Sequence, residues 1–171
     1  MDVHKALRRS AFFRNLTDER LTALAAIAHA EERQRGEYLF REGAPADRLY
    51  LIVSGRVELE IQIDAGGAIA VVEALSANDL VGWSAIVEPY LYTSSGRCVQ
   101  PTVVVAIDGR RLRELMRADA CLGLEIYQEI ARIVAQRLRD ARLRLTRWLH
   151  TTGTALAEEV ARAKPHAHQD A

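Results

Sequence analysis

The stretch that most constrains this chain is residues 36–55, GEYLFREGAPADRLYLIVSG. It holds two apolar runs, a short one at 38–40 and a longer one at 49–53, with a turn containing proline between them. Gly43 and Gly55 close the two halves, and glycine readily adopts the positive φ that tight turns require. Short apolar runs bounded by such turn residues predict β-strands joined as hairpins.

The strand-like period of two continues over the whole of residues 36–108. Apolar residues alternate with polar ones over 57–61, a turn signal follows at 65–67, and further apolar runs come at 69–71 and 103–107. Many short strands separated by turn residues are typical of an antiparallel sandwich or barrel.

Helical periods flank this β region on both sides. Residues 4–14 form a short amphipathic pattern, and Thr17 is placed to cap a second helix that we expect to end before Gly36. Residues 109–118 are helical in character, and the pattern over 122–163 is almost uninterrupted. The expected organisation is N-terminal helices over 1–35, the β region over 36–108, C-terminal helices over 109–163 and a disordered tail over 164–171.

Composition and charge exclude several classes of protein. Lys+Arg and Asp+Glu are both 23, so no net charge draws the whole chain to nucleic acid or to an anionic membrane. No apolar run is long enough to span a bilayer, and the first ten residues lack the apolar core of a secretory signal. We therefore expect a cytoplasmic protein. Cys98 and Cys121 are far apart and lack CxxC partners, which predicts free thiols and no zinc or iron–sulfur site.

Several turns and strands occur together in a characteristic order. They are Gly36-Glu37, the turn at 42–47, the hairpin at 49–59 and the strand at 104–108. In this order they resemble the cyclic nucleotide-binding domain, the sensory module of Crp/Fnr regulators, of the kinase A regulatory subunit and of gated channels. The resemblance implies an α+β fold. Its antiparallel β-roll (a double-stranded β-helix or jelly roll) would be flanked by N-terminal helices and by a long C-terminal dimerisation helix.

In ligand-binding members of that family, a phosphate-binding cassette holds the cyclic phosphate and the ribose. The resemblance places this cassette at residues 81–95. Gly82 keeps the family's glycine, Trp83 stands where a ribose-binding Glu is found, and Thr93 stands where an Arg neutralises the phosphate. A charge-assisted bond contributes on the order of 1.5–3 kcal/mol, so losing the Arg predicts cAMP affinity lower by roughly one to two decades. The candidate ligand-binding residues are Val81, Gly82, Trp83, Ser84, Ala85, Tyr92, Thr93, Ser94 and Ser95.

Two interpretations of the altered cassette remain open. In one, Trp83 and Tyr92 fill a vestigial pocket. In the other the pocket is retuned, so that Trp83, Tyr90 and Tyr92 stack on a ring while hydroxyls and backbone amides bind a less charged ligand. Arg97 is a candidate for the missing cation, although a solvated arginine is the more usual outcome on a strand. Beyond a cyclic nucleotide or another small ligand, we expect no cofactor and no metal.

The long C-terminal helix carries a heptad pattern. Apolar residues occupy both core positions for more than three heptads, which predicts a coiled-coil seam. In Crp/Fnr-like proteins the corresponding helix forms the homodimer interface, so the resemblance implies a homodimer here; the alternative is a helix that folds back on its own roll. The seam residues are Leu124, Tyr127, Ala131, Val134, Leu138, Ala141, Leu145 and Trp148.

Three outputs are compatible with the sequence. The first is a stand-alone regulatory or sensory module that couples a ligand in the roll to the C-terminal helices. The second is a ligand-free interaction or scaffold subunit that binds an unidentified partner protein. The third is a short transcription regulator that uses the arginines at 137–147. Crp/Fnr regulators place a helix-turn-helix domain after the long helix, whereas only a short tail follows here, so we do not expect DNA binding. No nucleophile–base pair or Gly-Lys phosphate loop stands out, so we do not expect an enzyme.

Overall fold

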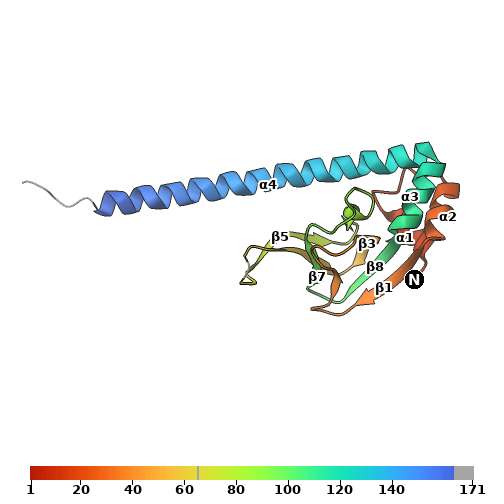
Figure 1. Ribbon diagram of the computed structural model, residues 1–171, viewed down its shortest axis with the longest axis horizontal. Helices are drawn as coiled ribbons and strands as arrows, with labels where there is room; N and C mark the ends of the chain where they lie inside the picture. The colour runs from red at the N-terminus through yellow and green to blue at the C-terminus, as the bar shows by residue number, and fades with distance from the viewer. Residues whose placement is uncertain (65, 164–171) are drawn as a thin grey trace, which may run out of the picture. The chain divides into compact units, whose positions relative to one another are not determined.

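The computed structural model describes residues 1–64 and 66–163, and the side chains of residues 1–64 and 66–150. Two four-stranded antiparallel sheets form a β-roll (Figure 1). Together with the flanking helices they confirm the predicted α+β fold. One sheet has the order β1 (Ala28–Arg33), β8 (Thr102–Asp108), β3 (Arg48–Ser54) and β6 (Leu80–Val81). The other has the order β2 (Tyr38–Phe40), β7 (Ser95–Cys98), β4 (Arg56–Gln62) and β5 (Ile69–Ser76).

Four α-helices and one short 3-10 helix complete the described part of the chain. Helices α1, α2 and α3 gather beside β1 and β8 (Figure 1), and α2 is capped by Thr17, as expected. The chain divides into a compact unit of residues 1–129 and a second unit that begins at Ile130. No described helix has the length and apolarity that a membrane-spanning segment needs. The helices are α1 (Val3–Arg9), α2 (Asp18–Ala25), η1 (Trp83–Ala85), α3 (Gly109–Ala118) and α4 (Ala120–Ala163).

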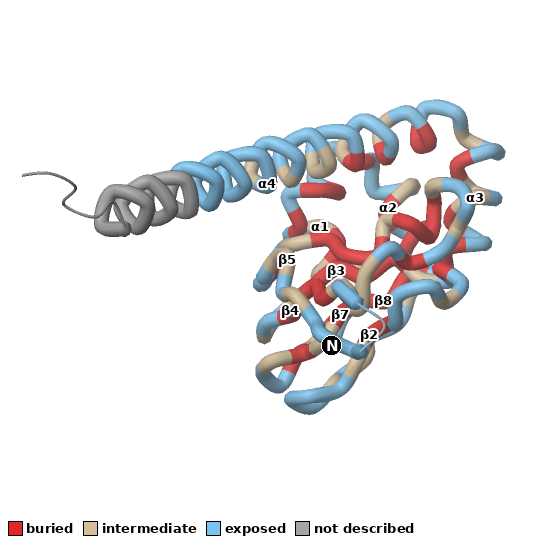
Figure 2. Tube along the Cα trace, turned by 60° about the vertical axis from the view of Figure 1, so that its left-hand side comes forward, coloured by how far each residue is buried: buried red, intermediate tan, exposed pale blue. Residues whose placement is uncertain are grey.

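The core of the first unit centres on β8. Four consecutive residues, Val104 to Ile107, have no exposed surface, so both faces of this strand are covered. β8 lies between β1 and β3 in its sheet, and helices α1 and α3 contact it as well. A strand covered on both faces favours a continuous apolar run over alternation, which explains the sequence VVVAI. Figure 2 shows the buried residues concentrated in the roll and in its adjoining helices.

The N-terminal boundary of the β region differs from the prediction. We expected helix to continue toward Gly36, but α2 ends at Ala25 and β1 follows at Ala28–Arg33. β1 pairs with β8 along its whole length, from Ala28 opposite Ile107 to Arg33 opposite Thr102. Its AHAEER sequence has little apolar alternation, so pairing with β8 and not local propensity makes it a strand. The tail expected at 164–171 lies outside the described residues.

Arg20 of α2 holds the junction between α3 and α4. Its Nε and Nη2 atoms donate to the two carboxylate oxygens of Asp119 at 2.7 and 3.1 Å. Its Nη1 atom donates to Glu125 Oε1 at 2.9 Å. Asp119 Oδ1 also accepts from the Leu122 N–H at 3.0 Å and so caps α4. The bonds from Arg20 and then from Leu122 hold the pKa of Asp119 below its ordinary value.

This arrangement predicts an acid-sensitive contribution to stability. Because the pKa of folded Asp119 is lowered, its stabilisation is complete above the unfolded pKa of about 3.9 and is lost as pH falls through the folded value. Asp119→Asn should therefore be less stable than the wild type at neutral pH and should lose less stability on acidification. Urea unfolding from pH 7 to pH 3 measures both effects.

Asp108→Asn is the matched control. Asp108 caps α3 by accepting from the Arg111 N–H at 2.9 Å, so its loss removes a capping carboxylate and leaves the Arg20 contacts intact. Parallel stability profiles for Asp119→Asn and the wild type would contradict the prediction.

Candidate functional site

The predicted cassette, residues 81–95, runs from the end of β6 through η1 and a loop to the start of β7. The chain turns sharply at Gly82, whose φ of 80° lies in the left-handed region. A Cβ atom at Gly82 would lie 2.9 Å from the Arg48 carbonyl oxygen and 3.3 Å from the Tyr92 ring. The family's glycine is therefore required here both by backbone conformation and by the closeness of β3.

The start of η1 presents polar groups without protein partners. Val81, Ser84 and Ala85 are buried, and Trp83 is half-buried. The Ser84 side chain forms no hydrogen bond to any described residue, although only 7% of this residue is exposed. The N–H groups of Trp83 and Ser84 likewise donate to no acceptor within the described chain. One hydroxyl and two amides of the cassette thus lack a protein partner among the described residues.

Tyr92 is part of the roll's interior. Its ring stacks on Phe40, with centroids 4.1 Å apart and planes 17° from parallel, and Phe40 also stacks with Tyr50 at 5.9 Å. The Tyr92 hydroxyl donates to the Arg48 carbonyl at 2.8 Å and accepts from the Arg48 N–H at 3.2 Å. Burial raises the pKa of Tyr92 and raises that of Tyr50 to about 12. This packing favours the interpretation in which Tyr92 fills the pocket.

Backbone hydrogen bonds also tie the cassette loop to the turn at 42–47. The Gly43 N–H donates to the Tyr92 carbonyl at 2.8 Å, and the Tyr92 N–H donates to the Ala44 carbonyl at 3.0 Å. The Ala46 N–H donates to the Tyr90 carbonyl at 2.7 Å. The segment on which the family resemblance rests and the loop of the cassette therefore form one hydrogen-bonded structure.

The three hydroxyl residues after Tyr92 differ in their surroundings. Thr93 is exposed, whereas Ser94 and Ser95 are half-buried. The Ser95 hydroxyl accepts from the Glu42 N–H at 3.0 Å and so helps to hold the neighbouring turn. The side chains of Thr93 and Ser94 form no hydrogen bond within residues 1–64 and 66–150.

Arg97 forms ion pairs with two carboxylates of β4. Its Nε atom donates to Glu60 Oε1 at 2.5 Å, and its Nη2 atom lies 3.5 Å from Glu58 Oε2. Glu60 is only 4% exposed and also accepts from the Tyr38 hydroxyl at 3.0 Å. A buried carboxylate requires such partners. The contacts therefore give Arg97 a structural role and disfavour it as a substitute for the missing phosphate-binding cation.

Two side chains from the following helices bind the cassette. Arg113 of α3 donates from Nη1 to the Ala85 carbonyl, and its guanidinium lies 4.3 Å from the centroid of the Tyr90 ring. The Tyr127 hydroxyl of α4 donates to the Ile86 carbonyl at 3.4 Å. No sequence pattern singled out Arg113, which is one of several polar residues of α3. Tyr127 was expected only in the helix seam.

The predicted seam of α4 is uncovered in the described chain. Its large side chains, Leu124, Tyr127, Leu138, Leu145 and Trp148, are between 49% and 62% exposed. Ala131 and Ala141 are exposed as well, and Val134 is half-buried. An exposed apolar stripe of this length marks an interaction surface. The homodimer expected from the sequence remains a prediction.

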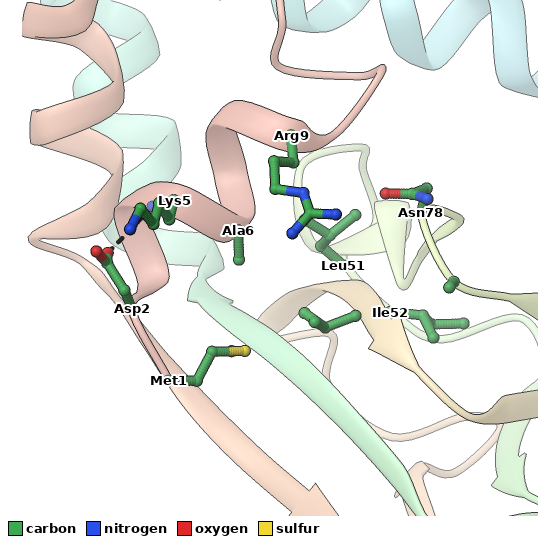
Figure 3. Close-up of a pocket in the computed structure, with 10 residues that line it drawn as sticks. Met1, Asp2, Lys5, Ala6, Arg9, Leu51, Ile52 and Asn78 are labelled. Atoms are coloured by element: carbon green, nitrogen blue, oxygen red, sulfur yellow. Dashed lines mark hydrogen bonds between the residues drawn. The ribbon is translucent and has the colours of Figure 1, made fainter.

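A separate hollow of about 430 Å³ lies between α1 and β3 (Figure 3). Leu51 and Ile52 of β3 form an apolar wall of this hollow, and Ala6 and Arg9 of α1 line it from the other element. Figure 3 shows the Arg9 guanidinium directed from α1 toward the loop that carries Asn78. No cassette residue lines this hollow, so it is distinct from the site expected from the sequence.

The cassette turn predicts a specific loss of stability. Gly82→Ala should lower the free energy of unfolding by about 2–3 kcal/mol, because left-handed strain adds to the contact with the Arg48 carbonyl. Gly43→Ala is the matched control, since Gly43 has a φ of 76° and no atom within 4 Å of its Cβ position. The free energy of unfolding of Gly43→Ala should fall by only the cost of left-handed strain, about 1–2 kcal/mol. Equal losses in chemical denaturation would show that the contact with Arg48 has no effect.

Comparison with known proteins identifies the domain. A family model described as the cyclic nucleotide-binding domain matches residues 30–119, more than half of the chain. The crystal structure of a candidate cyclic nucleotide-binding protein from Geobacter metallireducens GS-15 is similar, with 35% identity and a TM-score of 0.73. The match covers 81% of this chain and 99% of that protein.

Two regulators are also similar. The N-terminal domain of a transcriptional regulator from Streptomyces coelicolor A3(2) has 26% identity and a TM-score of 0.62, over 80% of this chain and 94% of that one. A CRP-like cAMP-activated global transcriptional regulator of Mycobacterium tuberculosis is 28% identical over 137 residues, or 80% of this chain. The match spans only 59% of that regulator's length. From the roll, the cassette and these similarities, we conclude that the chain belongs to the cyclic nucleotide-binding domain family.

Proposed function

We propose that this protein is a regulatory or sensory module in which a small ligand at the cassette acts on the C-terminal helices. One observation carries the proposal: neighbouring carbonyls of the cassette, those of Ala85 and Ile86, accept hydrogen bonds from α3 and from α4. A ligand that displaces η1 must strain or break these bonds. Such a ligand therefore binds less tightly when the helices keep these bonds than when the helices have released them. A difference in affinity between two helix arrangements is what transmission of the signal requires.

The chemistry of the cassette favours a ligand with less charge than a cyclic nucleotide. Trp83 and Thr93 replace the charged pair of ligand-binding relatives, and Arg97 is already neutralised by Glu60. The groups that remain are hydroxyls, amides and the half-buried face of Trp83. Such a set suits a neutral or weakly charged molecule with a ring, held by hydrogen bonds and stacking. In this proposal the role of the cassette is binding and not catalysis.

The proposal also includes self-association. The exposed seam of α4 has the heptad spacing of a coiled coil, and a second copy is the occupant expected from the family resemblance. The cytoplasmic location expected from the sequence is part of the same proposal. Analytical ultracentrifugation of the wild type and of Leu138→Asp/Leu145→Asp tests self-association directly. A dimer that persists in the double variant would exclude this seam as the interface.

The missing charges predict a gain of function. Trp83→Glu/Thr93→Arg should bind cAMP roughly ten- to one-hundred-fold more tightly than the wild type, because it restores charge-assisted bonds to the ribose and phosphate. Isothermal titration calorimetry measures the difference, with cGMP and cyclic dinucleotides in the same panel. Trp83→Gln/Thr93→Gln is the uncharged control. A folded Glu/Arg variant that does not gain cAMP affinity would show that the cassette cannot accept a cyclic phosphate.

The same variant makes coupling measurable with a known ligand. Saturating cAMP should change hydrogen exchange in the first turns of α4, and Tyr127→Phe added to that background should reduce the change by about half or more, because the bond to Ile86 is lost. Tyr90→Phe is the matched control, since it removes a phenol hydroxyl from the cassette loop and leaves α4 untouched. Equal exchange responses to cAMP with and without Tyr127→Phe would contradict coupling through Tyr127.

A second candidate function is a ligand-free interaction subunit. It is favoured by Tyr92, whose ring is stacked on Phe40 and whose hydroxyl already binds both backbone groups of Arg48. In that case neither the wild type nor Trp83→Ala should bind any member of the calorimetric panel. Partner binding that survives deletion of residues 122–163 would exclude α4 as its docking element.

A further inference from the structure

Helix α4 carries a concentration of positive charge around its apolar seam. Residues 130–150 contain six arginines and one acidic residue, Asp140, although the whole chain is neutral. Figure 2 shows that this part of the helix is predominantly exposed. We call residues 137–148 of α4 the arginine-flanked seam. Its core residues are Leu138, Ala141, Leu145 and Trp148, and its flanking residues are Arg137, Arg142 and Arg144.

The three flanking arginines occupy the positions that select a coiled-coil partner. With Leu138 and Leu145 at position a and Ala141 and Trp148 at position d, Arg142 falls at e, while the residues before each leucine, 137 and 144, fall at g. Side chains at e and g border the seam and determine which helix can pair with it. Neither Arg142 nor Arg144 forms an ion pair within the described chain.

A second copy of α4 does not supply the complementary charge. In a parallel pair, Arg137 of one copy lies opposite Arg142 of the other. In an antiparallel pair, g positions face g positions and e positions face e positions, and arginine again meets arginine or an uncharged residue. Every e and g position from 124 to 150 lacks an acidic side chain: Gln128, Ile130, Ala135, Arg137, Arg142, Arg144 and Leu149. Like charges across such positions destabilise the pair.

Nucleic acid matches only half of this surface. Phosphates would neutralise the arginines. They would leave Leu138, Leu145 and Trp148, each about half exposed or more, in contact with water. A helix with an apolar stripe bordered by carboxylates covers both parts at once, because it buries the leucines and pairs the arginines.

We propose that the arginine-flanked seam docks an amphipathic helix of a partner protein, with apolar residues at a and d and acidic residues at e and g. This rests on the proposed role of α4 as the output helix, and it names the chemistry of the partner. A second copy occupies the same seam more weakly, so the acidic helix displaces it.

Two synthetic peptides test the preference on the full chain. Both are four-heptad helices with leucine at a and d and identical residues at b, c and f; one carries Glu at e and g, and the other carries Lys. Fluorescence anisotropy at physiological ionic strength should show the Glu peptide binding about tenfold or more tightly than the Lys peptide.

Charge reversal provides the decisive variant. Arg137→Glu/Arg142→Glu/Arg144→Glu should reverse the preference, so that the Lys peptide becomes the tighter ligand. The matched control, Arg132→Glu/Arg139→Glu/Arg147→Glu, makes the same change of charge on the opposite side of the helix and should keep the preference for the Glu peptide. Circular dichroism checks that both triple variants remain helical.

Several outcomes would overturn the proposal. These are equal affinity for the two peptides, binding of neither peptide, or a wild-type dimer in ultracentrifugation that the Glu peptide does not displace. The last result would support self-association and make the second copy the true occupant. A duplex oligonucleotide that competes with the peptide and binds Leu138→Ala/Leu145→Ala as well as the wild type would identify nucleic acid instead. Calorimetry at the cassette is independent of these measurements, so failure of the sensory proposal is seen separately.

Discussion

The geometry of the candidate site depends on how Tyr92 fastens the cassette loop to β3. Its hydroxyl binds both backbone groups of Arg48, and its backbone binds the turn that contains Gly43 and Ala44. The same Arg48 carbonyl stands 2.9 Å from the missing Cβ of Gly82. One backbone position on β3 thus locates both ends of the cassette. In the proposed function, a ligand would therefore meet a preformed frame, with η1 and its contacts with α3 and α4 as the part proposed to respond.

The fold was predictable because its signals are local. The hairpins of residues 36–55 carry their own turn residues and apolar period, and the run at 103–107 reads as a strand without its partners. β1 was missed because its strand character comes from pairing with β8. The alternation over 57–61 would place Glu60 and Leu59 on opposite faces of the strand. A register irregularity between these two residues breaks the alternation and places both in buried positions.

The candidate site was predictable only in part. Gly82 could be inferred from its place in the family pattern, and its left-handed φ gives the physical reason. The contacts that decide the roles of Arg97 and Arg113 could not be inferred. Each side chain binds a residue far along the chain, Glu60 and Ala85 respectively, and single-sequence patterns do not reveal such pairings. Tyr92 illustrates the same difficulty, because stacking on Phe40 and stacking on a ligand require the same residue type.

The neutrality of the chain has a consequence once its charges are divided between the two units. Residues 1–129 hold 19 acidic and 15 basic side chains, so the unit that contains the roll is acidic, whereas the described helix beyond it is strongly basic. The zero net charge is thus the sum of a negative charge on the first unit and a positive charge on the rest of the chain. Long-range electrostatics would repel the proposed acidic partner from the first unit and attract it to the helix before any contact forms. The distribution of charge would therefore direct such an encounter to one part of the molecule, a bias that the total charge conceals.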